Sequence, residues 1–263
     1  MKDTIFYFTG TGNSLAVAKK LAAQAGYELA PMAALRDAEE VRIDCGRVGL
    51  VFPLYYTGLP LIVKRFIQKL EFQNKPYIFA VVTCGDTQYS YALHGMRSEL
   101  KQKGQRLSAG FTVPMVDNYL PIYKMPRPDE LETVNRGVDE KAHAIAEVIH
   151  RGEEKMEREG KWIFHAIYPR FALVAPKLDR KFTVGEACNG CGTCEKVCPV
   201  ENIQIKDGKP SYLHHCEFCL ACIHHCPKTA IEWKDKTRGK GRYRYPEVTL
   251  KEIMGQKTMI TSE

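Results

Sequence analysis

The sequence predicts an α/β fold in which a doubly wound, five-stranded parallel sheet is joined to a small, cysteine-rich α+β domain. Over the first 115 residues, apolar segments of strand length alternate with segments of helical periodicity. This alternation is typical of a parallel sheet with helices on both faces. Nearer the C-terminus, eight of the ten cysteines recur as two copies of one pattern. A chain of 263 residues can hold one medium-sized domain and one small one.

The expected elements follow from their apolar patterns. The first strand is a continuous apolar and aromatic run, which is typical of a strand buried on both faces. The clearest helix has apolar residues at spacings of three and four between Leu131 and Ile149. We expect strands at 3–9, 27–32, 48–54, 77–83 and 109–113, and helices at 15–25, 60–70, 90–103 and 131–149. Such sheets bind ligands at the carboxyl ends of their strands, near the point where the strand order reverses.

Three loops at these carboxyl ends form the candidate ligand site. The first opens a helix, and its glycines allow backbone N–H groups to converge while Thr, Asn and Ser side chains add neutral donors. Because it has no lysine and no third glycine, it fits a single terminal phosphate rather than a triphosphate or a dinucleotide. The alternative is a glycine-rich turn with a good helix cap. The candidate residues are Thr9, Gly10, Thr11, Gly12, Asn13 and Ser14 in the first loop, Pro53, Leu54, Tyr55, Tyr56, Thr57 and Gly58 in the second, and Thr83, Cys84, Gly85 and Asp86 in the third.

The cysteine repeat predicts two [4Fe–4S] clusters. Each copy reads Cys-x-x-Cys-x-x-Cys-x-x-x-Cys-Pro, and every position recurs 28 residues later. In this arrangement three cysteines of one copy bind one cluster, and the fourth binds the other cluster. The weaker alternatives are structural zinc, which requires neither the third cysteine nor the closing Cys-Pro, and disulfides, which suit short secreted chains. The expected ligands are Cys188, Cys191, Cys194 and Cys226 for the first cluster, and Cys216, Cys219, Cys222 and Cys198 for the second.

The first loop resembles the flavodoxin phosphate loop, Ser/Thr-x-Thr-Gly-x-Thr/Ser, which holds the phosphate of flavin mononucleotide (FMN). The second resembles the flavodoxin segment whose aromatic residue covers the flavin ring, and the third resembles the loop whose backbone contacts the pyrimidine edge. With the cysteine repeat, the chain resembles the fused flavodoxin–ferredoxin proteins of anaerobic microbes. This resemblance implies a flavodoxin-like domain that binds FMN and a ferredoxin domain with two [4Fe–4S] clusters.

Tyr55 and Tyr56 are equal candidates for the aromatic cover of the flavin. Neighbouring residues of an extended chain point to opposite sides, so we expect only one of the two to stack on the ring. The alternative is that both tyrosines are structural.

The expected division of the chain is a flavodoxin-like domain at 1–159, a packed helical joint at 160–182, a ferredoxin domain at 183–234 and a basic tail at 235–263. The net charge is +7, and we expect the tail to be solvated, with docking of an acidic redox partner as the alternative. No DNA-binding signature accompanies these bases, so no nucleic-acid partner is expected. No apolar stretch is long enough to span a bilayer, and no export signal is evident, so we expect a cytoplasmic protein.

Further expectations concern residues beside these sites. Residues 117–129 follow the fifth strand and are either the outer wall of the flavin pocket or a surface loop. We expect Cys45 and Cys84 to be buried fillers rather than redox thiols, and Asp86 to be a turn former. Four histidines border the second cysteine run; we expect them to be exposed, with tuning of the cluster potential as the alternative. They are His214, His215, His224 and His225.

The leading functional hypothesis is electron transfer. A flavin takes up two electrons and can release them singly, whereas a cluster passes one, so a chain with both can connect the two kinds of exchange. No nucleophile–base pair or carboxylate pair stands out, and we therefore expect the cofactors to supply the chemistry. The alternatives are an FMN-dependent reductase of a small organic substrate and a zinc-binding adaptor. The partner is expected to be a redox protein or a small-molecule acceptor, and the sequence assigns no oligomeric state.

Overall fold

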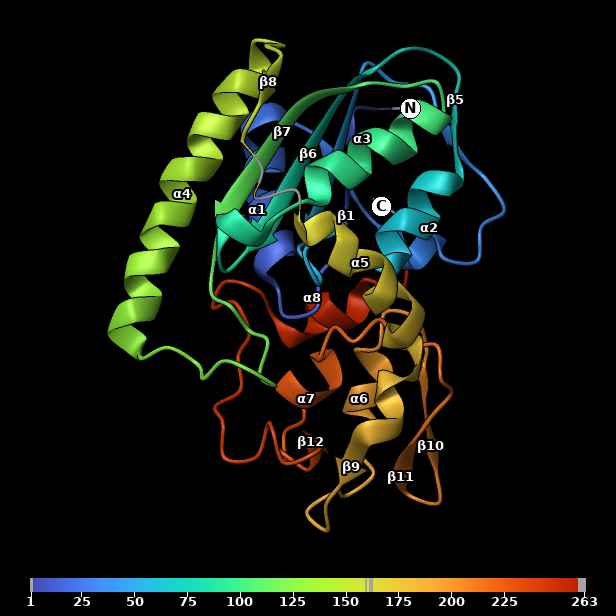
Figure 1. Ribbon diagram of the computed structural model, residues 1–263, viewed down its shortest axis with the longest axis vertical. Coiled ribbons are helices and arrows are strands. Elements are labelled where there is room, and N and C mark those ends of the chain that lie inside the picture. Colours follow the sequence, from blue (N-terminus) through green and yellow to red (C-terminus); the bar gives the residue numbers. More distant parts are fainter. Residues whose placement is uncertain (1, 159, 161–162, 260–263) are drawn as a thin grey trace.

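The computed structural model describes residues 2–158, 160 and 163–259 (Figure 1). Parts of the predicted joint, residues 161 and 162, and of the predicted tail, residues 260–263, lie outside the described residues. A flavodoxin-like α/β part occupies the N-terminal half, and a cysteine-rich part follows it along the chain and lies against one end of the sheet (Figure 1).

The sheet is parallel and has the strand order β2-β1-β4-β6-β7-β8. Its first five strands confirm the predicted ones, and β8 is an additional edge strand of two residues. The chain runs outward from β1 to β2 and returns on the other side of β1 to form β4, so the switch point lies between β1 and β4. The strands are β1 (Thr4–Tyr7), β2 (Glu28–Pro31), β4 (Arg47–Pro53), β6 (Tyr77–Cys84), β7 (Leu107–Pro114) and β8 (Lys155–Met156).

Helices cover both faces of this sheet (Figure 1). Alternate residues of a strand point to opposite faces. Accordingly, Ile5 and Tyr7 pack with α1 and α4, while Phe6 and Phe8 pack with α2 and α3. The helices are α1 (Asn13–Ala25) and α4 (Pro128–His150) on one face, and α2 (Leu61–Gln68) and α3 (Ala92–Gln102) on the other. Two 3₁₀ helices, η1 (Met32–Leu35) and η2 (Thr87–Tyr89), and a separate parallel pair, β3 (Val41–Ile43) and β5 (Leu70–Phe72), complete this part.

The segment predicted as the joint is helical from 163 to 181. It contains α5 (Ile163–Val174) and the 3₁₀ helix η3 (Ala175–Lys181). The Tyr168 hydroxyl donates a hydrogen bond to the carbonyl oxygen of Leu59 (2.7 Å), and Phe171 and Ala175 are buried. These contacts fix the joint against the end of the sheet from which the second loop emerges.

The cysteine-rich part has the internal symmetry that its repeat predicts. Its two short helices, α6 (Thr193–Lys196) and α7 (Ala221–His224), each begin after a residue with positive φ, Gly192 (75°) and Leu220 (59°). Two antiparallel pairs flank these helices. They are β9 (Phe182–Val184) with β12 (Ile231–Trp233), and β10 (Ile203–Lys206) with β11 (Lys209–Tyr212).

The prediction of a solvated tail is wrong for the segment 243–255, which packs against the sheet domain. Tyr243, Tyr245, Val248 and Ile253 are buried, and the last helix, α8 (Leu250–Gly255), lies beside α1, where Lys19 and Glu252 form an ion pair (2.7 Å). Tyr243 and Tyr245 lie on either side of Arg244, so this stretch can bury its tyrosines while the arginine between them stays exposed. We call residues 243–255 the C-terminal strap.

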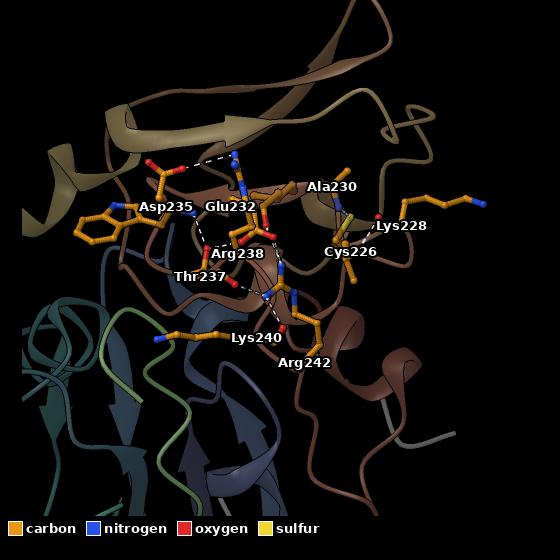
Figure 2. Close-up of polar contacts among 12 residues, drawn as sticks. Cys226, Lys228, Ala230, Glu232, Asp235, Thr237, Arg238, Lys240 and Arg242 are labelled. Carbon is orange, nitrogen blue, oxygen red and sulfur yellow. Dashed lines mark hydrogen bonds and ion pairs between the residues drawn. The ribbon is translucent and has the colours of Figure 1, made fainter. Parts of the chain in front are cut away.

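The bases that precede the strap are also partly ordered. Arg242 pairs with Glu232 (2.7 Å) and donates to the carbonyl oxygens of Thr237 and Lys240 (Figure 2). Lys240 donates to the carbonyl oxygen of Leu120. Across the described ranges, no helix combines the length and the apolar character that a membrane span needs.

A candidate redox site at the junction of the two parts

A cavity of about 300 Å³ lies where the three predicted loops meet the cysteine-rich part. Its volume is at the lower end of the range for small-molecule sites. Fourteen of the sixteen predicted loop residues line it; the exceptions are Gly12 and Gly58. The sequence did not predict the remaining lining residues from the cysteine-rich part, which are Phe218, Cys219 and Leu220.

The first loop has the geometry of an anion-binding helix start. Helix α1 begins at Asn13, so its first-turn N–H groups have no partner within the helix and carry its positive dipole end. Gly12 has a φ of 104°, and its N–H donates to the Thr9 hydroxyl (3.0 Å), which closes the turn. Neutral donors around a positive dipole end fit a phosphate dianion without a lysine. The loop therefore suits a terminal phosphate group.

Two glycines of this loop allow close approach of other segments. A Cβ at Gly10 would lie 2.9 Å from the carbonyl oxygen of Cys219. A Cβ at Gly12 would lie 3.0 Å from Val248 and 3.1 Å from Tyr245 of the C-terminal strap. Both positions thus require the absence of a side chain, one for the cysteine-rich part and one for the strap.

The side chain of Asn13 has structural partners. Its carbonyl oxygen Oδ1 accepts a hydrogen bond from the Tyr243 hydroxyl (2.9 Å), and its Nδ2 donates to the carbonyl oxygen of Val116 (3.2 Å). The sequence predicts this amide as a phosphate donor and contains no sign of its contact with Tyr243. The Thr11 hydroxyl accepts a hydrogen bond from Asn118 (2.6 Å) and can still donate its own proton into the cavity.

The second loop turns sharply instead of running extended. Tyr55 and Gly58 exchange two backbone hydrogen bonds (3.1 and 3.0 Å), and Tyr56 and Thr57 between them have φ of 47° and 73°. Such a two-residue turn is favourable for Asn-Gly but strained for a β-branched residue. The premise that both tyrosines belong to an extended chain is therefore wrong, although both line the cavity.

The two tyrosines have different neighbours. Tyr56 stacks on Phe171 of α5, and its hydroxyl hydrogen-bonds to that of Tyr119. Tyr55 packs edge-on against Phe8, and burial raises its pKa well above the ordinary value. Each ring thus has a protein partner on one side.

The third loop and the outer wall complete the cavity. Burial, with a smaller contribution from Asp86, raises the pKa of the Cys84 thiol to about 12, which agrees with a buried filler rather than a reactive thiol. Residues 116–119, 122 and 123 line the cavity, so of the two alternatives for this segment the outer wall holds for these residues. Within it, burial raises the pKa of Asp117, and the nearby charge of Asp86 adds to this effect. Asp86 also caps η2 by accepting from the N–H of Gln88, as expected of a turn former.

The eight cysteines of the repeat surround two further cavities. Among the described residues, no group of three or more His, Cys, Asp or Glu side chains is placed to hold a single metal ion. Backbone N–H groups point at three of the sulfurs, those of Cys198, Cys216 and Cys226 (3.2–3.3 Å). This kind of N–H···S bond is found around iron–sulfur clusters. One cavity is lined by Cys188, Cys191, Cys194 and Cys226, and the other by Cys198, Cys216, Cys219 and Cys222, which are the two crossed sets that the spacing predicts.

Cys219 and Leu220 line both the second cysteine cavity and the cavity between the three loops. The second cysteine run is therefore the one that lies against the candidate flavin site. Glu217 fixes this run on the sheet domain, because its buried carboxylate accepts from the N–H of Ile62 at the start of α2 (3.0 Å) and pairs with Arg65.

Two of the four histidines contradict the prediction of exposure. His214 and His215 are exposed, but His224 and His225 on and beside α7 are buried. His225 donates from Nε2 to the carbonyl oxygen of Gly10 (3.1 Å). His224 accepts from the N–H of Tyr243 at Nδ1 (3.1 Å) and therefore donates from Nε2 to the carbonyl oxygen of Asn118 (2.9 Å). Burial lowers the pKa of His224 to about 3 and that of His225 to about 4, so both rings are neutral at ordinary pH.

Comparison with known proteins agrees with the cysteine pattern. Residues 187–238 match the family model described as a 4Fe-4S dicluster domain. A comparison with curated proteins gave no match.

Solved structures resemble the N-terminal half. A flavoprotein from Bacteroides uniformis has 16% identity over 51% of this chain and 96% of its own (TM-score 0.35). An azoreductase from Bacillus anthracis has 13% identity over 56% and 99% (TM-score 0.37), and a flavodoxin from Streptococcus pneumoniae has 12% identity over 55% and 99% (TM-score 0.33). These values are low, so the assignment of the fold rests on the strand order described above.

The dicluster match and the flavodoxin-like sheet with its phosphate-type loop together support a protein of the flavo-iron–sulfur class that transfers electrons.

Proposed function

We propose that this chain passes single electrons between two [4Fe–4S] clusters and FMN. The observation that carries the proposal is that Cys219, an expected ligand of the second cluster, lines the same cavity as the phosphate-type loop. A flavin bound there would supply the exchange between two-electron and one-electron chemistry. The second cluster would be the one that exchanges electrons with it.

The residues of the chain would hold the cofactor from three sides. The N–H groups at the start of α1 and the Thr11 hydroxyl would bind the phosphate dianion. Tyr55 and Tyr56 offer an aromatic surface for the ring system, and the wall formed by residues 116–119, 122 and 123 lines the cavity beside them. Thiolates of the two crossed cysteine sets would hold the clusters.

Quantification of cofactors and rapid mixing together test this proposal. A sample purified without oxygen should contain about eight irons per chain, with one FMN. After rapid reduction of the clusters, the absorbance of the oxidised flavin should decrease in a unimolecular phase. Four irons, bound zinc, or a flavin that stays oxidised beside reduced clusters would contradict the proposal.

Cysteine variants provide the matched control. Cys219→Ser should remove the unimolecular phase, because it alters the ligand nearest the flavin cavity. Cys45→Ser changes a buried free cysteine outside both cysteine sets and should leave the phase intact.

A second candidate is a flavin-dependent reductase of a small organic substrate. The observation that favours it is Asp117, a half-buried carboxyl group in the cavity wall whose pKa is raised by burial. Such a group could donate a proton to a substrate reduced at the flavin. Asp117→Asn would then stop substrate reduction while the transfer of electrons from clusters to flavin continued.

A further inference from the structure

The two cysteine sets differ in their access to solvent. In the second set, Cys198 and Cys222 are buried and the other two cysteines are partly buried. In the first set, Cys191 is exposed, and it is the one exposed cysteine of the whole repeat. The loop that carries Cys191 follows β9, in the part of the molecule that is farthest from the six-stranded sheet (Figure 1). An external protein can therefore approach the first cysteine set and cannot approach the second as closely.

Four lysines lie around this exposed cysteine. Lys228 lines the same cavity as Cys191, and its side chain extends away from the backbone around Cys226 (Figure 2). Lys196 is the last residue of α6, the helix that begins two residues after Cys191. Lys206 and Lys209 flank the β10–β11 turn.

The β10–β11 turn touches the loop of the first cysteine set. A Cβ placed on Gly190, next to Cys191, would lie 2.7 Å from the carbonyl oxygen of Gly208 in that turn. Lys206 and Lys209 therefore belong to the same surface as Lys228. We call Lys196, Lys206, Lys209 and Lys228 the lysine ring.

The charge of the lysine ring is not neutralised locally. All four lysines are exposed, and within the described ranges none of them forms an ion pair. The carboxylates close to them along the chain are Glu186, Asp207 and Glu195, which is half-buried and accepts from the N–H of Ile205 (3.3 Å). Four lysines thus stand against three carboxylates, so positive charge is in excess by one. By contrast, Glu201 of the cysteine-rich part pairs with Arg36 (2.7 Å) and Lys257 (3.7 Å). An excess of unpaired positive charge around an access point accelerates the approach of negatively charged partners.

We propose that the lysine ring is the docking surface for an acidic one-electron carrier protein, which exchanges electrons with the first cluster. This inference rests on the proposed function. One electron passes from the reduced partner to the first cluster, so the partner is oxidised by one electron, the cluster is reduced by one, and no bond forms or breaks. The first cluster is then the site where electrons enter or leave the protein, and the second cluster connects it to the flavin cavity.

Charge reversal tests the docking surface in the fully loaded protein. The test variant is Lys206→Glu with Lys209→Glu, and the control is Lys101→Glu with Lys155→Glu, which makes the same change of net charge with exposed residues of the sheet domain. The probe is a reduced plant-type [2Fe–2S] ferredoxin of strongly negative charge, mixed rapidly at low and high salt. A second reductant, photoreduced deazariboflavin, is small and uncharged, and it reports on the clusters and the flavin without docking.

We expect the test variant to react with the acidic ferredoxin at least about ten-fold more slowly at low salt, with a flatter salt dependence. The control should slow by less than about two-fold, and deazariboflavin should reduce both variants at the wild-type rate. Equal slowing of test and control, or no slowing of either, would overturn the docking surface. Should the test variant lose iron, the milder pair Lys206→Gln with Lys209→Gln decides by the same criterion. A flavin that stays oxidised after deazariboflavin reduces the clusters contradicts the proposed function instead, so the two failures are distinguishable.

Discussion

Replacement of Tyr245 by alanine should weaken FMN binding, because this residue of the C-terminal strap packs against the phosphate-type loop and holds its backbone in place. Its side chain is fully buried, its N–H donates to the carbonyl oxygen of Thr11 (2.9 Å), and its Cβ lies beside Gly12. Loss of a buried aromatic ring costs about 3–5 kcal/mol. FMN binding is weakened only by the part of this free energy that is lost as disorder of the phosphate-type loop. If that part is about 1.4–2.8 kcal/mol, the Kd for FMN rises about 10- to 100-fold.

Tyr245→Phe is the matched control. The Tyr245 hydroxyl is buried and has no hydrogen-bond partner among the described residues, so its removal does not cost a hydrogen bond and relieves a desolvation penalty of about 1–3 kcal/mol. We expect Tyr245→Phe to bind FMN at least as tightly as the wild type. The assay is anaerobic titration of the flavin-free protein, followed by flavin fluorescence, with iron content measured on the same samples.

An affinity of Tyr245→Ala within about two-fold of wild type, in a protein with full iron content, would refute a supporting role of the strap. Should the variant lose its iron, Val248→Ala tests the same contact with a smaller change, since Val248 is also buried against Gly12. A weaker affinity in both alanine variants but not in Tyr245→Phe is the expected result.

Three further predictions concern the other parts of the site. Gly10→Ala would place a Cβ 2.9 Å from the carbonyl oxygen of Cys219, so FMN affinity should fall about ten-fold or more in a fluorescence titration. The control is Gly46→Ala, whose Cβ meets nothing within 3.4 Å and should leave FMN affinity unchanged. Equal FMN affinities of the two variants would contradict the close approach of Cys219 to Gly10. Cys198→Ser should remove the second cluster and Cys226→Ser the first, each halving the iron content from about eight per chain. Loss of the same cluster from both variants, seen by paramagnetic resonance, would rule out crossed ligation. Because burial raises the pKa of the Cys84 thiol to about 12, iodoacetamide at mildly alkaline pH should not label it in the folded protein, and labelling as fast as in the unfolded chain would show a reactive thiolate.

The sheet could be predicted from the sequence because its strands are buried on both faces and so read as continuous apolar runs. The predicted strand at 77–83 is β6 (Tyr77–Cys84), and the predicted helix at 131–149 lies within α4 (Pro128–His150). The crossed cysteine sets were predictable for a different reason, since the ligand spacing of a cluster is fixed along the chain. The edge strand β8 was not predicted, because two residues carry no periodic pattern.

The contacts that complete the site were not predictable, because each joins residues far apart in sequence. His225 and Gly10 are 215 positions apart, and Tyr243 and Asn13 are 230 positions apart. A histidine reads as an exposed polar residue until its partner is known, and a basic segment reads as a tail until its apolar residues find a surface. The alternation of tyrosine and arginine between 242 and 245 is the one signal in the sequence that could have indicated a segment with a buried side.

The junction implies that the two parts stabilise each other. The phosphate-type loop accepts one hydrogen bond from His225 beside α7 and its helix start accepts one from the hydroxyl of Tyr243, the first residue of the strap, while Cys219 covers Gly10. Cluster ligation would order α7, and FMN would order the loop that α7 contacts, so each event favours the same arrangement. A ligand at a hundred times its Kd stabilises the state that binds it by about 2.7 kcal/mol. Part of this free energy should therefore appear as tighter docking of the cysteine-rich part on the sheet domain. A fragment ending before residue 160 would lack the contacts of Cys219, His225 and Tyr243 with the loop.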